Sequence, residues 1–211
     1  VSPRDGLQNE KTVVTTREKL KLLEGLVASS PSSIEVTSFV RADVIPALAD
    51  ADELCNRLWQ QQWAVEARDA GMRFAGLVLN KRGFERFFKA NLDTATVLIS
   101  CTESHSKANS NKGFDDALKL TCEIIKTGRG EGITMRGYAS MAFGCPFEGK
   151  TEPARVQTVV HAMMDAGAEH IILADTIGVG YPDQVRSLGK AALAVVPAER
   201  LGLHMHDTYG R

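Results

Sequence analysis

Short apolar runs alternate with segments of helical periodicity along the whole chain, and this alternation limits the fold more than any other feature. The runs are rich in apolar and β-branched residues and lie at 33–36, 74–79, 95–100, 134–138, 171–174 and 201–206. Each has the length of a strand rather than of a helix. Strands that alternate with helices predict βα units around a parallel sheet.

The intervening segments place apolar residues three and four positions apart. They lie at 16–28, 45–58, 82–90, 114–125, 153–166 and 182–196. Thr15 or Thr16 can cap the first of them, and two begin with proline, which suits a first helical turn. We expect their apolar faces to form the core.

Counting the strands favours a (β/α)8 TIM barrel. The six runs and a clipped strand at Val1-Ser2-Pro3 make seven, whereas a barrel has eight strands in about 250 residues. We therefore expect one catalytic domain over 1–211, with about seven of eight strands and both ends incomplete. The runner-up is a doubly wound open sheet. That fold carries a glycine-rich turn after its first strand, but 4–8 here is charged and has one glycine.

Composition excludes several function classes. The formal net charge of -1 gives no basis for binding nucleic acid or an anionic membrane. No apolar run reaches the roughly 20 residues that span a bilayer, and the chain starts without a leader-like segment, so we expect a soluble protein. The four cysteines form no Cys-x-x-Cys pair, which favours reduced thiols in a reducing compartment.

Polar side chains gather where the predicted strands end. They are Arg4, Asp5, Glu35, Asn80, Ser100, Glu103, Tyr138, Ser140, Asp175, Thr176, His204 and His206. In a barrel these ends converge on one face, where active sites lie. The pattern therefore indicates an enzyme.

His204-Met205-His206 is the most informative triplet. Residues two apart in a strand point to the same face, so both imidazoles can reach one ion while Met205 turns into packing. Two histidines and a carboxylate, for which Asp5 is the candidate, suit a divalent metal with open positions. The spacing does not separate magnesium, manganese, iron and zinc.

Arg4 and Asp5 allow two interpretations. They form a surface ion pair, or Asp5 binds the metal while Arg4 presents its guanidinium to a carbonyl oxygen that becomes negative. Glu35 lies in an apolar strand and needs a partner, for which Arg4 is the natural choice. Asp175 is a helix cap or a base.

Two further segments have structural and chemical interpretations. Cys145 has no identifiable histidine beside it, so a turn with a buried thiol is preferred to a nucleophile. The polar segment 104–113 is expected to be a solvated loop, in which Lys107 and Lys112 are able to meet a substrate phosphate.

Six blocks resemble the 3-hydroxy-3-methylglutaryl-CoA lyase family in the family's order. They lie at 1–11, 35–40, 136–138, 144–150, 175–180 and 204–210. Isopropylmalate and homocitrate synthases share some of them, whereas Pro-Arg-Asp-Gly-Leu-Gln-Asn-Glu and Gly-Cys-Pro-Phe-Glu-Gly are more specific to the lyase.

The resemblance implies cleavage of 3-hydroxy-3-methylglutaryl-CoA to acetyl-CoA and acetoacetate, as in leucine breakdown and ketone-body formation. It assigns Mg²⁺ or Mn²⁺ to Asp5, His204 and His206, with Arg4 on the enolate and Glu35 orienting Arg4. Asp175 and His204 become candidates for proton handling. The matching blocks add Gln8, Ser38 and Thr176, with Arg4, as substrate-binding residues.

The resemblance also implies a homodimer, located in the mitochondrial matrix of a eukaryote or the cytoplasm of a bacterium. In the family, a metal-ligating asparagine and a loop with a catalytic cysteine follow the seventh strand. We therefore expect the 211-residue chain to be inactive by itself. The segment 50–72 is longer than usual. The alternatives are a related acyl-CoA-dependent synthase and a non-catalytic fragment.

Overall fold

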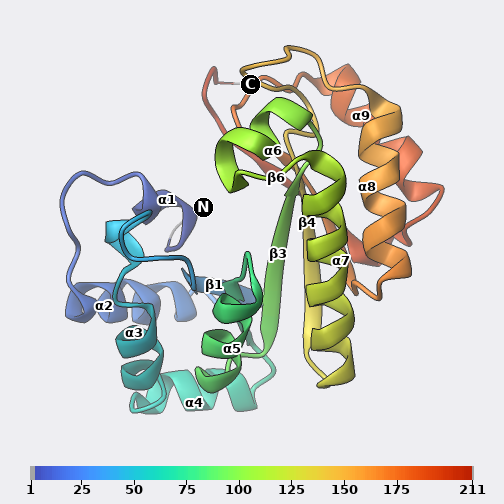
Figure 1. Cartoon of the computed structure of the whole chain (residues 1–211). Coiled ribbons are helices and arrows are strands. Elements are labelled where there is room, and N and C mark those ends of the chain that lie inside the picture. The colour runs from blue at the N-terminus through green and yellow to red at the C-terminus, as the bar shows by residue number, and fades with distance from the viewer. Residues whose placement is uncertain (1–2, 211) are drawn as a thin grey trace. The chain divides into compact units, whose positions relative to one another are not determined.

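A computed structural model describes residues 3–210; the Val1-Ser2 part of the expected first strand lies outside the described residues, and Pro3 lies in a turn. The chain forms two compact units, Val1–Thr96 and Val97–Arg211. Figure 1 labels their helices and strands. Each unit is described by itself.

The first unit contains three parallel strands or parts of strands. Its elements are α1 (Asp5–Gln8), α2 (Thr16–Val27), β1 (Ser33–Ser38), η1 (Pro46–Leu48), α3 (Ala51–Leu58), α4 (Gln62–Asp69), β2 (Arg73–Leu77), α5 (Lys81–Lys89) and the start of β3 (Thr94–Ser100). β1 pairs with β2, and β2 pairs with the start of β3. A bulge interrupts the β1 register between Glu35 and Thr37. Bulges of this kind re-aim side chains and are frequent beside active sites.

Helix α2 shows how the sequence specifies an element and its attachment. Thr15 caps it and forms a capping box with Glu18, which satisfies two backbone donors that a helix start leaves open. Its Lys19 is buried, and the ammonium group binds the Asp50 carboxylate and the Ala47 carbonyl. Through these contacts α2 is fixed to the segment that leads into α3.

The long segment 50–72 has a packing role. It forms α3 and α4, and Trp59 follows α3 directly. The Trp59 indole N–H donates to the Ala90 carbonyl at 2.8 Å, and the ring meets Phe74 edge-on at 5.4 Å between centroids. Phe39 and Phe87 make a second edge-on pair. These rings fill the space between the strands and their helices.

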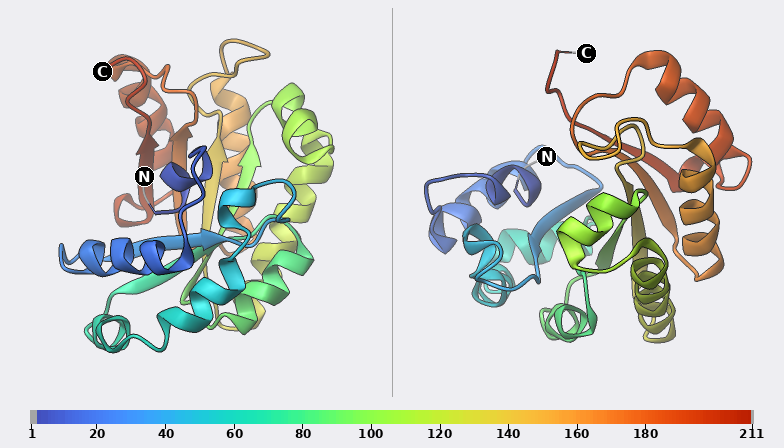
Figure 2. Two further views of the ribbon diagram at one scale, coloured as in Figure 1. Left: turned by 90° about the vertical axis from the view of Figure 1, so that its left-hand side faces the viewer. Right: turned by 45° about the horizontal axis from the view of Figure 1, so that its top comes forward.

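The second unit contains the rest of β3 and three further strands, β4 to β6. Its elements are α6 (Glu103–Ser110), α7 (Phe114–Gly130), β4 (Thr134–Ser140), α8 (Pro153–Asp165), β5 (His170–Asp175), α9 (Pro182–Leu193), η2 (Ala198–Arg200) and β6 (Leu201–Met205). β4 pairs with β5, and β5 pairs with β6. α7 and α8 pack on β4, α8 also packs on β5, and α9 packs on α8 (Figure 2).

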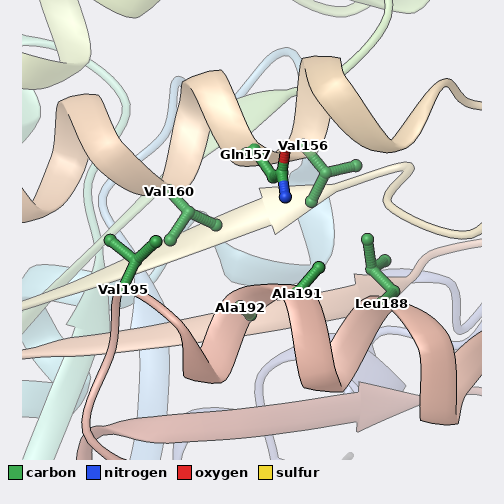
Figure 3. Close-up of a pocket in the computed structure, with 7 residues that line it drawn as sticks. All are labelled: Val156, Gln157, Val160, Leu188, Ala191, Ala192 and Val195. Carbon is green, nitrogen blue, oxygen red and sulfur yellow. The ribbon is translucent and has the colours of Figure 1, made fainter.

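Close approach between helix and strand in this unit depends on glycine. A Cβ on Gly128 of α7 would lie 2.2 Å from Met135 Sδ, and one on Gly137 of β4 would lie 2.5 Å from Met163 Sδ. An apolar crevice lies between α8 and α9 (Figure 3). It is lined by Val156, Gln157 and Val160 of α8, by Leu188, Ala191 and Ala192 of α9, and by Val195. No titratable side chain lines it, so it belongs to helix packing.

The strand order supports the predicted fold and excludes the runner-up. The described strands run β1 to β6, each beside the next in the sequence. A doubly wound sheet reverses its strand order at a switch point, whereas a (β/α)8 barrel does not. Between residues 3 and 210, no helix is both long and apolar enough to cross a membrane.

Some local predictions were wrong. The expected helix at 45–58 is split into η1 and α3, and the expected loop at 104–113 is mostly α6. The strand expected at 74–79 ends at Leu77, and that at 201–206 ends at Met205, so His206 follows the strand. Met205 is 38% exposed and does not turn into packing.

Candidate active site

Arg4 is a buried hub of polar contacts in the first unit. Its side chain is only 7% exposed, so the interpretation as a surface ion pair is wrong. Nε donates to Glu35 Oε1 at 2.5 Å, and Nη1 donates to Asp5 Oδ1 at 3.2 Å and to Gln8 Oε1 at 3.3 Å. The predicted Arg4–Glu35 partnership is confirmed.

The sequence places these four groups together for local reasons. Arg4 precedes α1, and Asp5 and Gln8 begin and end that single helical turn. Residues four apart on a helix lie on one face, which brings Gln8 beside Arg4. Glu35 reaches the guanidinium from β1, immediately before the bulge.

β1 and the start of β3 also carry buried polar atoms that no described residue satisfies. Among residues 3–210, Glu35 Oε2 and the Ser38 hydroxyl are buried without a hydrogen-bond partner, as are the Thr37 and Thr96 hydroxyls. Buried polar atoms are normally paired, and unpaired ones mark places where water or a ligand binds. Ser38, predicted to bind substrate, is therefore available for a polar contact.

His204 and His206 converge in the second unit. Their Nε2 atoms are 3.0 Å apart. The Tyr138 ring meets the His204 ring at 5.6 Å between centroids. His206 Nδ1 is 2.9 Å from the Thr176 carbonyl oxygen. A carbonyl only accepts, so Nδ1 carries the proton, and Nε2 of the neutral ring presents a lone pair.

Asp175 ends β5 and holds the turn that follows. Its side chain is buried, with Oδ1 accepting from the Val179 N–H at 3.0 Å and Oδ2 from the Gly180 N–H at 2.8 Å. It does not cap α9, because that helix begins at Pro182 after Tyr181. Each carboxylate oxygen keeps a second lone pair, so the turn contacts leave a proton-accepting role open.

Thr176 uses its side chain within the fold. Its hydroxyl oxygen accepts from the Met141 N–H at 3.0 Å. The sequence did not single out Met141, which follows β4 with a φ of 57°. Nothing in the local sequence marks it, because left-handed backbone is usually assigned to glycine or asparagine.

Cys145 is a buried thiol in a turn, as expected. It is 3% exposed and exchanges two backbone hydrogen bonds with Gly149. The Thr102 hydroxyl donates to its sulfur at 3.2 Å. Nearby, Glu148 accepts from the Ser104 N–H at the start of α6. The turn therefore ties α6 in place.

An ion pair stabilises helix α6, which contains Lys107. Lys107 forms an ion pair with Glu103 at 2.9 Å, and Glu103 also accepts from the Phe114 N–H. The hydrogen bond from Lys107 is the largest cause that lowers the pKa of the Glu103 carboxyl. The hydrogen bond from Phe114 to Glu103 joins the start of α6 to the start of α7.

Comparison with known proteins places these residues in one family. The family model described as HMGL-like matches residues 1–211. The chain is 38% identical to the mitochondrial hydroxymethylglutaryl-CoA lyase of Arabidopsis thaliana over 211 residues, covering 100% of this chain and 43% of that protein. It is 37% identical to the Bos taurus mitochondrial enzyme over 211 residues, covering 100% of this chain and 62% of that protein.

A solved structure agrees with the fold. The crystal structure of HMG-CoA lyase from Bacillus subtilis matches with a TM-score of 0.90 at 34% identity, over 98% of this chain and 66% of that one. This likeness confirms the predicted barrel-type α/β fold. The chain spans less than two thirds of the length of the Arabidopsis thaliana and Bos taurus relatives.

Proposed function

Because this chain belongs to the HMGL-like family, we propose that it carries catalytic side chains of a metal-dependent carbon–carbon lyase. The substrate is 3-hydroxy-3-methylglutaryl-CoA, and the products are acetyl-CoA and acetoacetate. The observation that carries the proposal is the convergence of the His204 and His206 Nε2 atoms, 3.0 Å apart. The names of the relatives, hydroxymethylglutaryl-CoA lyases, support the choice of substrate.

His204 and His206 fit a divalent ion, and Asp5 would supply the third ligand. Two nitrogens on adjacent corners of an octahedral ion, each at about 2.1 Å, lie about 3.0 Å apart. The hydrogen bond from His206 Nδ1 to a backbone carbonyl is the arrangement that orients ligating histidines. Mg²⁺ or Mn²⁺ bound there would act as a Lewis acid toward the substrate's hydroxyl and carboxylate oxygens.

Arg4 stabilises the negative charge that develops on the thioester oxygen. Its guanidinium is buried and held by Glu35, so it needs no reorganisation when charge appears. Glu35 orients the guanidinium by accepting from Nε.

The chemical step is a retro-Claisen cleavage. A base removes the proton of the tertiary hydroxyl, and the oxygen lone pair forms the ketone of acetoacetate as the C2–C3 bond breaks. The bond electrons pass to an enolate of acetyl-CoA, and a proton delivered to C2 completes the methyl group. Asp175 and His204 are the proposed proton-handling groups, and Gln8, Ser38 and Thr176 help bind the substrate.

The biological setting is part of the same proposal. We place the activity in leucine breakdown and ketone-body formation, with a homodimer as the working form. The Bos taurus relative is mitochondrial and another relative is from Bacillus subtilis. The first name supports a mitochondrial location in a eukaryote, for which we propose the matrix, and in a bacterium we propose the cytoplasm.

Product analysis of the natural gene product separates the lyase from a synthase. The protein is supplied with Mg²⁺ and either 3-hydroxy-3-methylglutaryl-CoA or acetyl-CoA with a panel of 2-oxo acids. We expect equal amounts of acetyl-CoA and acetoacetate from the first mixture and no condensation in the second. Condensation with a 2-oxo acid and no acetoacetate would replace the lyase with the synthase.

A further inference from the structure

Met141 follows β4 in a backbone conformation that residues other than glycine seldom adopt. Its φ is 57°, where an L side chain is disfavoured. The residue is 2% exposed. Such a conformation persists only when its surroundings hold it, and such positions cluster at functional sites.

Two threonine hydroxyls bind the backbone of Met141. Its N–H donates to Thr176 Oγ1 at 3.0 Å, and its carbonyl accepts from Thr151 Oγ1 at 2.6 Å. Thr151 is buried. Both backbone polar groups of Met141 are therefore satisfied by hydroxyls, and one of those hydroxyls comes from the turn after β5.

The backbone of Thr176 contacts His206. Its carbonyl oxygen lies 2.9 Å from Nδ1 of that ring. This contact keeps the proton on Nδ1 and leaves the Nε2 lone pair directed toward His204. One residue thus contacts the strained end of β4 with its hydroxyl and a histidine with its carbonyl.

The turn that contains Thr176 is itself held on both sides. Asp175 accepts two backbone N–H groups from the far end of the turn. The Ala142 N–H donates to the Ala174 carbonyl at 3.1 Å, which joins the ends of β4 and β5. The turn is therefore joined to the end of β4 both by this backbone hydrogen bond and by the Thr176 hydroxyl.

We propose that Thr176 is a positioning residue that couples the conformation of Met141 to the tautomer of His206. Its hydroxyl accepts from Met141 and fixes the carbonyl, and the carbonyl selects the Nδ1–H form of His206. The importance of that tautomer for metal binding rests on the proposed function. Direct contact between Thr176 and the substrate is not needed for this role.

Imidazole NMR tests the coupling without any metal. Histidine-labelled, metal-free natural gene product is studied at about pH 8.5, where imidazoles with pKa near 6.5 are neutral. Two-bond ¹H–¹⁵N correlations identify the protonated nitrogen, and His206→Gln assigns the signal. We expect wild-type and Thr176→Ser to carry the proton on Nδ1. Thr176→Val should show a mixture with the Nε2–H form.

Mn²⁺ titration followed by EPR gives the second readout. Losing an outer-shell partner typically weakens metal binding by about 10- to 100-fold, and we expect a loss in that range for Thr176→Val. Thr176→Ser should restore the wild-type affinity. Thr158→Val is the matched control, because the Thr158 hydroxyl donates to the Ala154 carbonyl on the exposed side of α8.

The outcomes separate this inference from the proposed function. If Thr176→Val does not fold, Thr176→Ala is measured in its place, because it leaves room for water at the Met141 N–H. A wild-type His206 protonated on Nε2 overturns the inference whatever the variants do, and so does an unchanged tautomer in a folded variant. A tautomer shift without Mn²⁺ binding by any form supports the coupling and rejects the metal assignment.

Discussion

His204 and His206 present their Nε2 atoms to each other across 3.0 Å, and His206 Nδ1 is 2.9 Å from a backbone carbonyl. The separation equals that of two neighbouring nitrogens on one octahedral ion. The backbone carbonyl at Nδ1 therefore leaves Nε2 of His206 facing Nε2 of His204.

The first prediction concerns this pair. His204→Ala and His206→Ala should each weaken Mn²⁺ binding by at least about 100-fold, because each removes a proposed ligand. His161→Ala, at an exposed position of α8, should bind as the wild type does. EPR titration of free Mn²⁺ measures all three. Equal affinity in the two site variants and the control would remove the pair from the metal site.

The second prediction concerns the buried ion pair of Arg4 and Glu35. Their side chains are 7% and 14% exposed, so Glu35→Ala leaves a buried guanidinium without its strongest acceptor. The free energy of unfolding should fall by about 3–5 kcal/mol, as for other broken buried pairs. Urea midpoints measure it, with exposed Glu85→Ala as the control, expected to change little. A midpoint for Glu35→Ala close to that control would show that the pair contributes little.

The third prediction concerns thiol reactivity. Burial raises the pKa of the Cys55 and Cys101 thiols to about 12. At pH 8.5 each thiol is ionised to less than about one part in a thousand, and the thiolate is the reactive form. Iodoacetamide should therefore label the half-buried Cys122 first in native protein, and Cys55 and Cys101 only after unfolding. Peptide mapping by mass spectrometry would contradict this if Cys55 or Cys101 reacted first.

The same pKa shifts give a pH dependence. Because the folded-state values lie above the ordinary value near 9.0, the buried thiols stabilise the fold below about pH 9. That contribution is lost as the pH rises toward 12, since the unfolded chain releases these protons first.

The fourth prediction concerns Gly178. Its φ is 66°, and a Cβ there would lie 2.1 Å from Thr208 Oγ1 and 2.9 Å from the His206 carbonyl oxygen. Gly178→Ala should displace His206 and weaken Mn²⁺ binding by about 10-fold or more. Gly132→Ala is the control, since Gly132 has a φ of 75° with open space around it. Equal Mn²⁺ affinity in both variants would show that the backbone of His206 tolerates the contact.

Much of the fold was predictable because the spacing of apolar residues along the sequence indicates which side of a helix or strand is buried. The helix expected at 153–166 is observed as Pro153–Asp165, and the strand expected at 95–100 as Thr94–Ser100. Helix α6 was missed because its Ser, Asn and Lys residues carry no apolar stripe. It is held by Glu103, Lys107 and Glu148, and sequence spacing does not reveal the last of these contacts.

Site residues were predictable where a charged side chain occurs at a position that is normally apolar. A carboxylate in an apolar strand required a cation, and Glu35 does pair with Arg4. The wrong inference for Met205 came from assuming that the second face of the strand is covered, whereas Leu203 and Met205 are exposed. The sequence did not indicate Met141, because its importance comes from its φ and from the hydroxyls of Thr151 and Thr176, which are distant in the sequence.

Metal-dependent release of acetoacetate tests the central claim most directly. The natural gene product is stripped with EDTA, given 3-hydroxy-3-methylglutaryl-CoA, and assayed before and after Mg²⁺ or Mn²⁺ is restored, beside Arg4→Gln. We predict no turnover without metal, full turnover on restoration, and a loss of about 10²–10³-fold in Arg4→Gln, as for one lost oxyanion contact. Acetoacetate release that persists in EDTA, or equal rates for wild type and Arg4→Gln, would contradict the account.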